Sequence, residues 1–264
     1  MTDLAFIGGG NMAEALIKGI TAGRAGSYKI TVSEPKEERR QYLEKQYGVK
    51  ATASNAEAVR AAKTIVLAVK PQIMEDVLRD IAGDVSGEHT VISIAAGVRL
   101  SFLGERLGTK RLVRVMPNTP ALVGEGMSVI SLCECLEDSV VSVVKDIFMS
   151  VGKAMVMPEK YMDAVTALSG SGPAFCALFI EGLVEGAVRA GLSAEDARLL
   201  ALQTAAGTLK MLEDGMATGD LVRMVTSPGG TTEAGLKVLD GKGFKQALYD
   251  TIDAAARRAA ELGR

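Results

Sequence analysis

The sequence has no uninterrupted run of about 18 apolar residues, the length that a membrane-spanning helix needs. Its N-terminus lacks the basic start and apolar stretch of a secretory signal. It also has no excess of positive charge, because the formal net charge is -2 at pH 7 and no Lys- or Arg-rich patch is interleaved with aromatic residues. We therefore expect no membrane span, no signal peptide and no nucleic-acid partner.

Cysteine and histidine are also scarce. Cys133, Cys135 and Cys176 form an odd set with C-x-C spacing, which indicates neither a disulfide framework nor a zinc site. Reduced thiols in a cytoplasmic protein are expected. The single histidine, His89, precedes a predicted strand and is expected in a loop. The sequence predicts no metal site.

Strand-sized apolar runs alternate with helix-like segments in the first half of the chain. Short apolar runs separated by helices predict a parallel sheet that is covered on both faces. Ser54 and Glu57 have capping-box spacing and predict a helix start. The predicted strands are Leu4–Ile7, Lys29–Ser33, Thr64–Val69, Thr90–Ile94, Arg111–Met116 and Gly126–Ser131.

The rhythm changes near Met155–Tyr161, after which no convincing strand appears. The following sequence is rich in Ala, Leu and Gly at helical spacing, with Ser193 as an expected helix cap and Phe244–Leu262 as a terminal helix. The predicted fold class is therefore α/β: a Rossmann-type parallel-sheet domain, residues 1–158, followed by an all-α domain, residues 159–264.

Several segments of the second half are apolar on more than one helical face, among them Phe175–Ile180 and Leu199–Leu202. Such helices must be buried all round, and a domain of about 100 residues has little interior. A homodimer formed through these C-terminal helices would bury them. Docking against the first domain is the alternative.

A glycine-rich loop follows the first predicted strand. The segment Phe6–Ala13 (FIGGGNMA) fits G-x-G-x-x-A between a strand and a helix. Gly8 permits the tight turn, Gly10 lets the backbone approach a pyrophosphate, and Ala13 lets the helix pack on the strand. The helix N-terminus then offers N–H groups to the phosphates. The pattern predicts dinucleotide binding.

The end of the second strand bears on which nucleotide is bound. Ser33 is neutral where an NAD-specific fold usually has a carboxylate, and Lys36 and Arg39 follow closely. These groups suit a 2′-phosphate and favour NADPH, although a solvated helix face explains the two cations equally well. Glu34, one position later, keeps NADH as an alternative.

Three further segments end strands at the edge where such sheets bind ligands. Ala68–Pro71 closes the third predicted strand, and Pro71 turns the chain outward. Ala95–Gly97 offers small residues beside which a nicotinamide ring would fit. Met116–Pro120 contains Asn118, which could hydrogen-bond a carboxamide.

Two glycine-rich segments, Thr166–Ala174 and Val225–Glu233, interrupt the second half. Glycine and proline at this density cost helix stability, so we expect them to form a binding site or a particular packing arrangement. In the later segment, N–H groups of a helix start near Thr231, with the hydroxyls of Ser227, Thr231 and Thr232, would form an anion site for a small carboxylate. Capping and close helix packing are the alternative.

These motifs resemble the pyrroline-5-carboxylate reductase family along essentially the whole chain. The resemblance implies reduction of the cyclic imine 1-pyrroline-5-carboxylate to L-proline, usually with NADPH. It also implies a helical C-terminal domain that interlocks with its partner in a dimer, with larger rings of dimers in many members. The similar segments are FIGGGNMA, AVKP, AAG, MPNTP, DAVTALSGSGPAF and LVRMVTSPGGTTEAGLKVLD.

The resemblance also implies contacts for individual residues. Lys36 and Asn118 are expected cofactor contacts as well, because Lys36 suits a 2′-phosphate and Asn118 could hydrogen-bond a carboxamide. Thr166 is similar to a threonine near the imine, and family variation at position 231 weakens a specific role for that hydroxyl. Expected cofactor contacts are Ile7, Gly8, Gly9, Gly10, Asn11, Met12, Ser33, Lys36, Asn55, Ala68, Val69, Lys70, Pro71, Ile94, Ala95, Ala96 and Asn118. Expected substrate contacts are Ser227, Gly229, Gly230, Thr231 and Thr232, supplied across the dimer.

The sequence offers no strong general acid, so an imine that arrives protonated would chiefly need orientation and charge complementarity. We expect Thr166 and Thr232 to hydrogen-bond the imine nitrogen. Two other functions are considered. A β-hydroxyacid dehydrogenase is disfavoured because the helical turns directly after Ser169–Pro173 contain no lysine. A non-catalytic NADPH sensor is disfavoured because it needs no carboxylate site.

Overall fold

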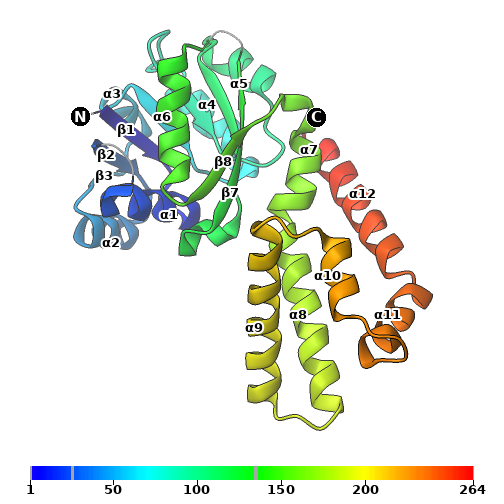
Figure 1. Cartoon of the computed structure of the whole chain (residues 1–264). Coiled ribbons are helices and arrows are strands. Elements are labelled where there is room, and N and C mark those ends of the chain that lie inside the picture. The colour runs from blue at the N-terminus through cyan, green and yellow to red at the C-terminus, as the bar shows by residue number, and fades with distance from the viewer. Residues whose placement is uncertain (1, 25–26, 134–135, 264) are drawn as a thin grey trace. The chain divides into compact units, whose positions relative to one another are not determined.

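The structure is a computed structural model that describes residues 2–24, 27–133 and 136–263, so the expectation for Cys135 lies outside the described residues. The chain forms two compact units. The first comprises Met1–Ser171 and Ala254–Arg264, and the second comprises Gly172–Asp253. Each unit is described by itself below (Figure 1).

The first unit is built on one eight-stranded sheet with the order β3-β2-β1-β4-β5-β6-β7-β8. All neighbouring strands run parallel except β6 and β7, which are antiparallel. The strands are β1 (Thr2–Ile7), β2 (Tyr28–Ser33), β3 (Lys50–Thr52), β4 (Thr64–Leu67), β5 (Thr90–Ser93), β6 (Leu112–Met116), β7 (Gly126–Leu132) and β8 (Gly152–Val156).

All six predicted strands are present, and two strands were missed. β3 is only three residues long, so it carries almost no periodic signal. β8 is largely exposed, with Lys153, Met155 and Val156 open to solvent, and its short apolar stretch lacks the polar–apolar alternation of a half-buried strand and ends at Pro158. The antiparallel pairing of β7 was also not predicted, because pairing direction depends on the path of the chain between strands.

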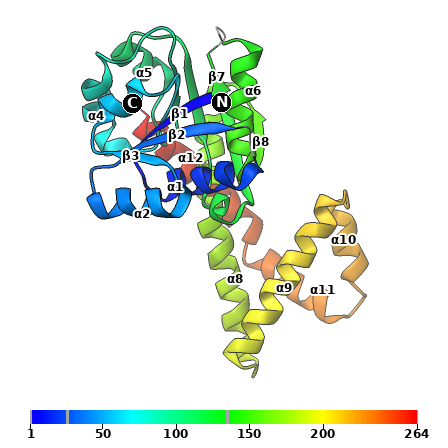
Figure 2. The same ribbon diagram turned by 90° about the vertical axis from the view of Figure 1, so that its left-hand side faces the viewer.

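Helices lie on both faces of the sheet (Figure 2). Alternate side chains of the strands contribute to two cores, one on each face. Leu4 and Phe6 of β1 lie in one core, and Ala5 and Ile7 lie in the other. The first core is closed by residues of α1 (Asn11–Gly19), α2 (Glu37–Tyr47) and α6 (Asp138–Met149). The second is closed by α3 (Asn55–Arg60), α4 (Met74–Ile81) and α5 (Leu100–Leu107).

Local capping agrees with the sequence. The Ser54 hydroxyl accepts from the Glu57 N–H over 3.2 Å at the start of α3, and the Ser193 hydroxyl accepts from the Asp196 N–H over 3.1 Å at the start of α9. Such caps typically stabilise a helix by about 1 kcal/mol. His89 lies in the loop before β5, as expected, where its Nδ1 accepts from the Ser86 N–H over 2.9 Å.

The helical half begins before the second unit. A helical turn, Glu159–Tyr161, leads into α7 (Met162–Val165), a π-helical turn (Thr166–Gly170) and α8 (Gly172–Arg189). π-Helical turns are rare and occur frequently at functional sites. The other helices are α9 (Ala194–Glu213), α10 (Thr218–Val225), α11 (Thr231–Gly241) and α12 (Phe244–Leu262), whose end from Ala254 belongs to the first unit.

The second unit exposes much apolar surface in the single chain. Leu178 and Leu199 are 68% and 67% exposed, and Phe179 and Leu209 are also open. The helical stretch Glu159–Arg189 is long and apolar enough to cross a membrane by length and composition alone. The sequence criterion counted uninterrupted apolar residues and did not register this stretch, which is broken by Gly, Ser and Pro. A single such helix is weak support for a membrane span.

Candidate functional site

The glycine loop between β1 and α1 is anchored at Gly8. Gly8 has φ +99°, a conformation that strains any other residue, and its N–H donates to the Ser33 carbonyl over 2.8 Å. A Cβ at Gly8 would lie 2.6 Å from the backbone oxygen of Ala68. Ile7, immediately before it, is 1% exposed. The turn therefore requires glycine and is wedged between the ends of β2 and β4.

Gly10 has the opposite surroundings. It is the N-cap of α1 with no side-chain cap, and a Cβ placed on it would meet no atom within 4 Å. Ala13 is fully buried on the other side of the helix. The first N–H groups of α1, at Asn11 and Met12, have no partner within the helix. An open cradle with bare amides fits the pyrophosphate of a dinucleotide.

A cleft of about 460 Å³ lies beside this cradle, at the carboxyl ends of the central strands. Ten of the expected cofactor contacts line it. The residue that the sequence reasoning missed is Pro117, although the MPNTP segment around it was singled out. The lining residues are Gly10, Asn11, Met12, Ala68, Val69, Lys70, Pro71, Ile94, Ala95, Ala96 and Pro117.

Of the expected cofactor contacts outside the cleft lining, Ser33 lies at the end of β2, Lys36 at the start of α2 and Asn55 at the start of α3. The Ser33 hydroxyl, on a buried residue, donates to Asn55 Oδ1 over 2.6 Å. The Asn55 amide in turn donates to Asp80 Oδ2 over 2.9 Å. Lys36 is exposed at the N-cap of α2. Ser33 and Asn55 thus form a preset polar pair, and Lys36 is available to solvent.

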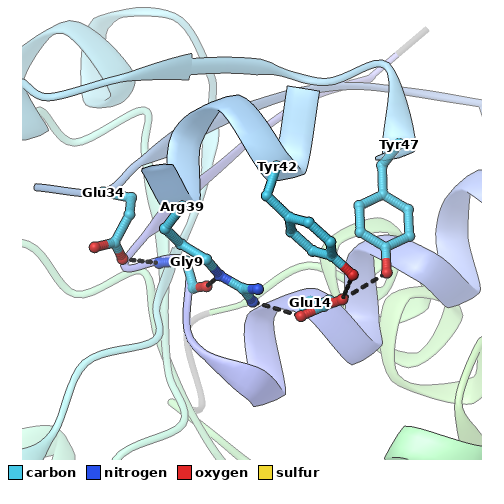
Figure 3. Close-up of polar contacts among 6 residues, drawn as sticks. All are labelled: Gly9, Glu14, Glu34, Arg39, Tyr42 and Tyr47. Atoms are coloured by element: carbon cyan, nitrogen blue, oxygen red, sulfur yellow. Dashed lines mark hydrogen bonds and ion pairs between the residues drawn. The ribbon is translucent and has the colours of Figure 1, made fainter. Parts of the chain in front are cut away.

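A second polar cluster stands directly behind the glycine loop (Figure 3). The Gly9 N–H donates to Glu34 Oε2 over 3.0 Å, and Arg39 Nε donates to the Gly9 carbonyl over 2.7 Å. Arg39 also pairs with Glu14 on α1. Tyr42 and Tyr47 complete the cluster by donating to Glu14. The cluster links the loop, α1 and α2.

The ionisation of this cluster follows from its contacts. Burial alone raises the pKa of Glu14, but hydrogen bonds from Tyr47, Arg39 and Tyr42 outweigh it and hold the pKa below the ordinary value of 4.5. Burial, followed by the hydrogen bond to Glu14, raises the pKa of Tyr47. Glu14 is therefore an anion, and Tyr47 a neutral donor, at neutral pH.

The first glycine-rich segment lies against the end of β6. The Asn118 amide donates to the Ser169 hydroxyl over 3.3 Å, and Asn118 Oδ1 accepts from the Met127 N–H over 2.8 Å. A Cβ on Gly170 would lie 2.4 Å from Met116 Cε. Asn118 therefore ties this segment to the sheet next to the cleft residue Pro117. The Thr166 hydroxyl, on the same segment, donates to the Met162 carbonyl over 2.7 Å.

The later glycine-rich segment opens α11 in the second unit. Gly230 is the N-cap, its N–H donates to the Ser227 carbonyl over 3.0 Å, and Gly229 has φ +70°. The Gly229 N–H donates to Glu233 Oε2 over 2.6 Å. Lys237 and then the Gly229 N–H lower the pKa of Glu233. Thr231 and Thr232 occupy the first turn of α11, so the expected substrate residues form one local group.

A mostly parallel sheet with a glycine loop at its carboxyl edge, followed by helices, defines a nicotinamide-nucleotide oxidoreductase with a Rossmann-type domain. Residues 3–97 match the sequence model described as NADP oxidoreductase coenzyme F420-dependent, and residues 159–262 match the model for pyrroline-5-carboxylate reductase dimerisation. Together these cover both halves of the chain.

Whole-chain relatives are more specific. The chain is 43% identical to pyrroline-5-carboxylate reductase of Synechocystis sp. over 99% of its own length and 98% of the relative's, and 42% identical to that of Methanosarcina acetivorans over 99% and 98%. The Coxiella burnetii reductase structure matches with a TM-score of 0.91 at 34% identity, covering 100% and 99% of the two chains. The chain belongs to the pyrroline-5-carboxylate reductase family.

Proposed function

We propose that this protein reduces 1-pyrroline-5-carboxylate to L-proline at the expense of NADPH. The observation that carries the proposal is the open Gly10 cradle at the mouth of a cleft, in a chain that belongs to this reductase family. When bound, the nicotinamide supplies the hydride that reduces the imine carbon. The chain's own residues hold and orient the two reactants.

NADPH is favoured by the polar end of β2. Ser33 and Asn55 would hold the adenosine ribose, and the exposed Lys36 would reach the 2′-phosphate. A related reductase, that of Plasmodium falciparum, has been solved with NADP bound; it is 35% identical, with a TM-score of 0.89, covering 100% of this chain and 98% of that one. NADH is the second candidate because the Glu34 carboxylate lies at the same strand end.

Ile7–Met12 would wrap the pyrophosphate, and Ala68–Pro71 with Ile94–Ala96 would line the remainder of the cofactor site. Small side chains at Ala95 and Ala96 leave room for a flat ring. Asn118 would hold the segment around Ser169 in place beside the cofactor site, because its amide donates to the Ser169 hydroxyl and its oxygen accepts from the Met127 N–H.

Thr166 and Thr232 are the proposed contacts of the imine nitrogen. The Thr166 O–H is already donated to the Met162 carbonyl, so its oxygen lone pairs can accept. An acceptor suits an imine that arrives protonated, because its N–H then needs a partner and the product amine forms without a separate acid. Ser227, Gly229, Gly230 and Thr231 would hold the substrate carboxylate at the α11 N-terminus.

Two observations support the dimer across which the substrate residues would be supplied. Residues 159–262 match the family's dimerisation model, and α8, α10 and α11 have no buried residue in the single chain. We assign residues 1–158 to cofactor binding and 159–264 to substrate binding and dimerisation. A ring of dimers and a cytoplasmic location remain predictions.

Steady-state kinetics test the chemistry. We expect the purified protein to oxidise NADPH when given the cyclic imine, and to show no NADP reduction with β-hydroxyacids. Thr166→Ala and Thr232→Ala should each lower kcat/KM for the imine by about tenfold to a hundredfold, the effect of one lost transition-state contact. If both variants keep wild-type kcat/KM, the threonines have no role. NADPH binding without turnover of any imine would instead indicate a sensor.

A further inference from the structure

The peptide groups on both sides of Gly9 are held by residues distant in sequence. The Gly9 N–H donates to Glu34, and its carbonyl accepts from Arg39, which lie 25 and 30 residues further along the chain. A Cβ at this position would lie 2.8 Å from Cδ1 of the buried Leu43, so a side chain here would require Leu43 to move. The middle of the glycine loop is therefore fixed by tertiary contacts from the β2–α2 segment.

Arg39 is itself held firmly (Figure 3). It pairs with Glu14 Oε2, and its guanidinium carbon lies 5.1 Å from the centre of the Tyr42 ring. Glu14 Oε1 accepts from Tyr42 Oη over 2.9 Å and from Tyr47 Oη over 2.7 Å. The side chains of Arg39 and Glu14 are only 25% and 20% exposed. Partly buried, charge-assisted contacts of this kind are stronger than those of an exposed pair.

These contacts use the groups that a phosphate would need. A guanidinium usually binds phosphate with a fork of two parallel N–H donors. In Arg39, Nε is directed to the Gly9 carbonyl and one terminal nitrogen is directed to Glu14. The fork formed by Nε and that terminal nitrogen is therefore occupied by the protein, whereas Lys36 is exposed near the end of β2.

We infer that Arg39 is a positioning residue: together with Glu14 it holds the Gly9 peptide so that the loop amides face the pyrophosphate, and it does not recognise the 2′-phosphate. This inference rests on the proposed function. NADPH and NADH share the pyrophosphate and differ at the 2′-position. Loss of Arg39 therefore weakens the binding of both nucleotides by the same factor, whereas loss of a 2′-phosphate ligand weakens the binding of NADPH alone.

The test compares Arg39→Met, Glu14→Gln and Lys36→Met. For each, Kd is measured by NADPH and NADH fluorescence, and KM for both nucleotides and for the imine is measured by steady-state kinetics. We expect Arg39→Met to raise Kd and KM of both nucleotides about tenfold, with kcat and the KM of the imine changed less than twofold. Glu14→Gln should act in the same direction, and the double variant should be no worse than Arg39→Met because the pair acts as a unit. Lys36→Met should weaken NADPH alone.

A matched control separates positioning from general loss of rigidity. Tyr28→Phe removes a hydrogen bond to Asp146 Oδ2 of 2.9 Å at the other end of β2, roughly 16 Å from Ser33 at 3.3 Å per residue. It should leave the nucleotide KM values unchanged. Should Arg39→Met not fold, Tyr47→Phe removes one donor to Glu14 and should raise both Kd values two- to threefold.

Selective weakening of NADPH by Arg39→Met, no weakening of either nucleotide, or an equal effect of Tyr28→Phe would each overturn the inference. Failure of the proposed function looks different, because the wild-type protein itself would then bind no nicotinamide nucleotide or would leave the imine unreduced.

Discussion

The two loops that open α1 and α11 are both glycine-rich but have very different surroundings. In the first, Gly8 is wedged against the backbone of Ala68, and Gly9 is held by Glu34 and Arg39. In the second, a Cβ on Gly229 would meet nothing within 4 Å, and its N–H donates to Glu233 of the helix that it opens. The first loop is held by its own domain, whereas the second depends on local capping and on whatever covers the second unit.

The largest effect is expected at Gly8. Gly8→Ala places a methyl group 2.6 Å from a backbone oxygen at φ +99°, so both the overlap and the conformation oppose it. We expect loss of about 3 kcal/mol of stability and at least a hundredfold weaker NADPH binding. Thermal unfolding and fluorescence titration measure the two. Gly229 also has a left-handed φ, but its surroundings are open, so Gly229→Ala should lower the free energy of unfolding by only about 1 kcal/mol. Equal losses at both positions would remove the contrast between the loops.

A charge on the exposed apolar faces should act on assembly. Leu199→Glu places a carboxylate on a residue that is 67% exposed in the single chain and that a dimer would bury. We expect a dimer in the wild-type protein and a monomer in the variant by light scattering, with an apparent Tm lower by about 10 °C and dependent on concentration. Lys45→Glu, on the exposed surface of α2, should change neither; an unchanged mass for Leu199→Glu would place the interface elsewhere.

Arg114 tests how the sheet holds the start of the helical half. It is 4% exposed, and its guanidinium lies 3.1 Å from Glu159 Oε1 and 3.9 Å from Asp163 Oδ1. Arg114→Met should destabilise the first unit by about 2 kcal/mol, because carboxylates lose a buried partner. Denaturant unfolding gives the free energy. A loss no larger than that of exposed Arg79→Met would show that the pairs do not stabilise the fold.

The smallest effect concerns pH. Because the pKa of Glu14 is lower in the folded protein than its ordinary value of 4.5, its contribution to stability is complete above that value and is lost as the pH falls through the folded pKa. The stability difference between wild type and Glu14→Gln should therefore be constant, at about 1 kcal/mol, from pH 8 to pH 5, and should shrink below pH 4.5. A difference that grew on acidification would contradict the lowered pKa.

Local rules account for the features that the sequence predicted. The tight turn at Gly8, the cap at Ser193 and the buried strands each depend on a few neighbouring residues. The sequence reasoning did not foresee the engagement of Arg39, because that contact joins residues 30 positions apart and Arg39 reads equally well as a phosphate ligand or a solvated cation. Nor did it foresee β8, whose short apolar stretch lacks the alternating pattern of a half-buried strand.

The most direct test of the account is a fluorescence titration of wild type and Gly10→Ala with NADPH. A Cβ at Gly10 meets nothing within 4 Å, so the variant should keep the wild-type Tm, while its methyl group occupies the space assigned to the pyrophosphate. We predict binding by the wild-type protein and at least tenfold weaker binding by the variant. Equal affinities at equal Tm would contradict the assignment of this loop as the nucleotide cradle.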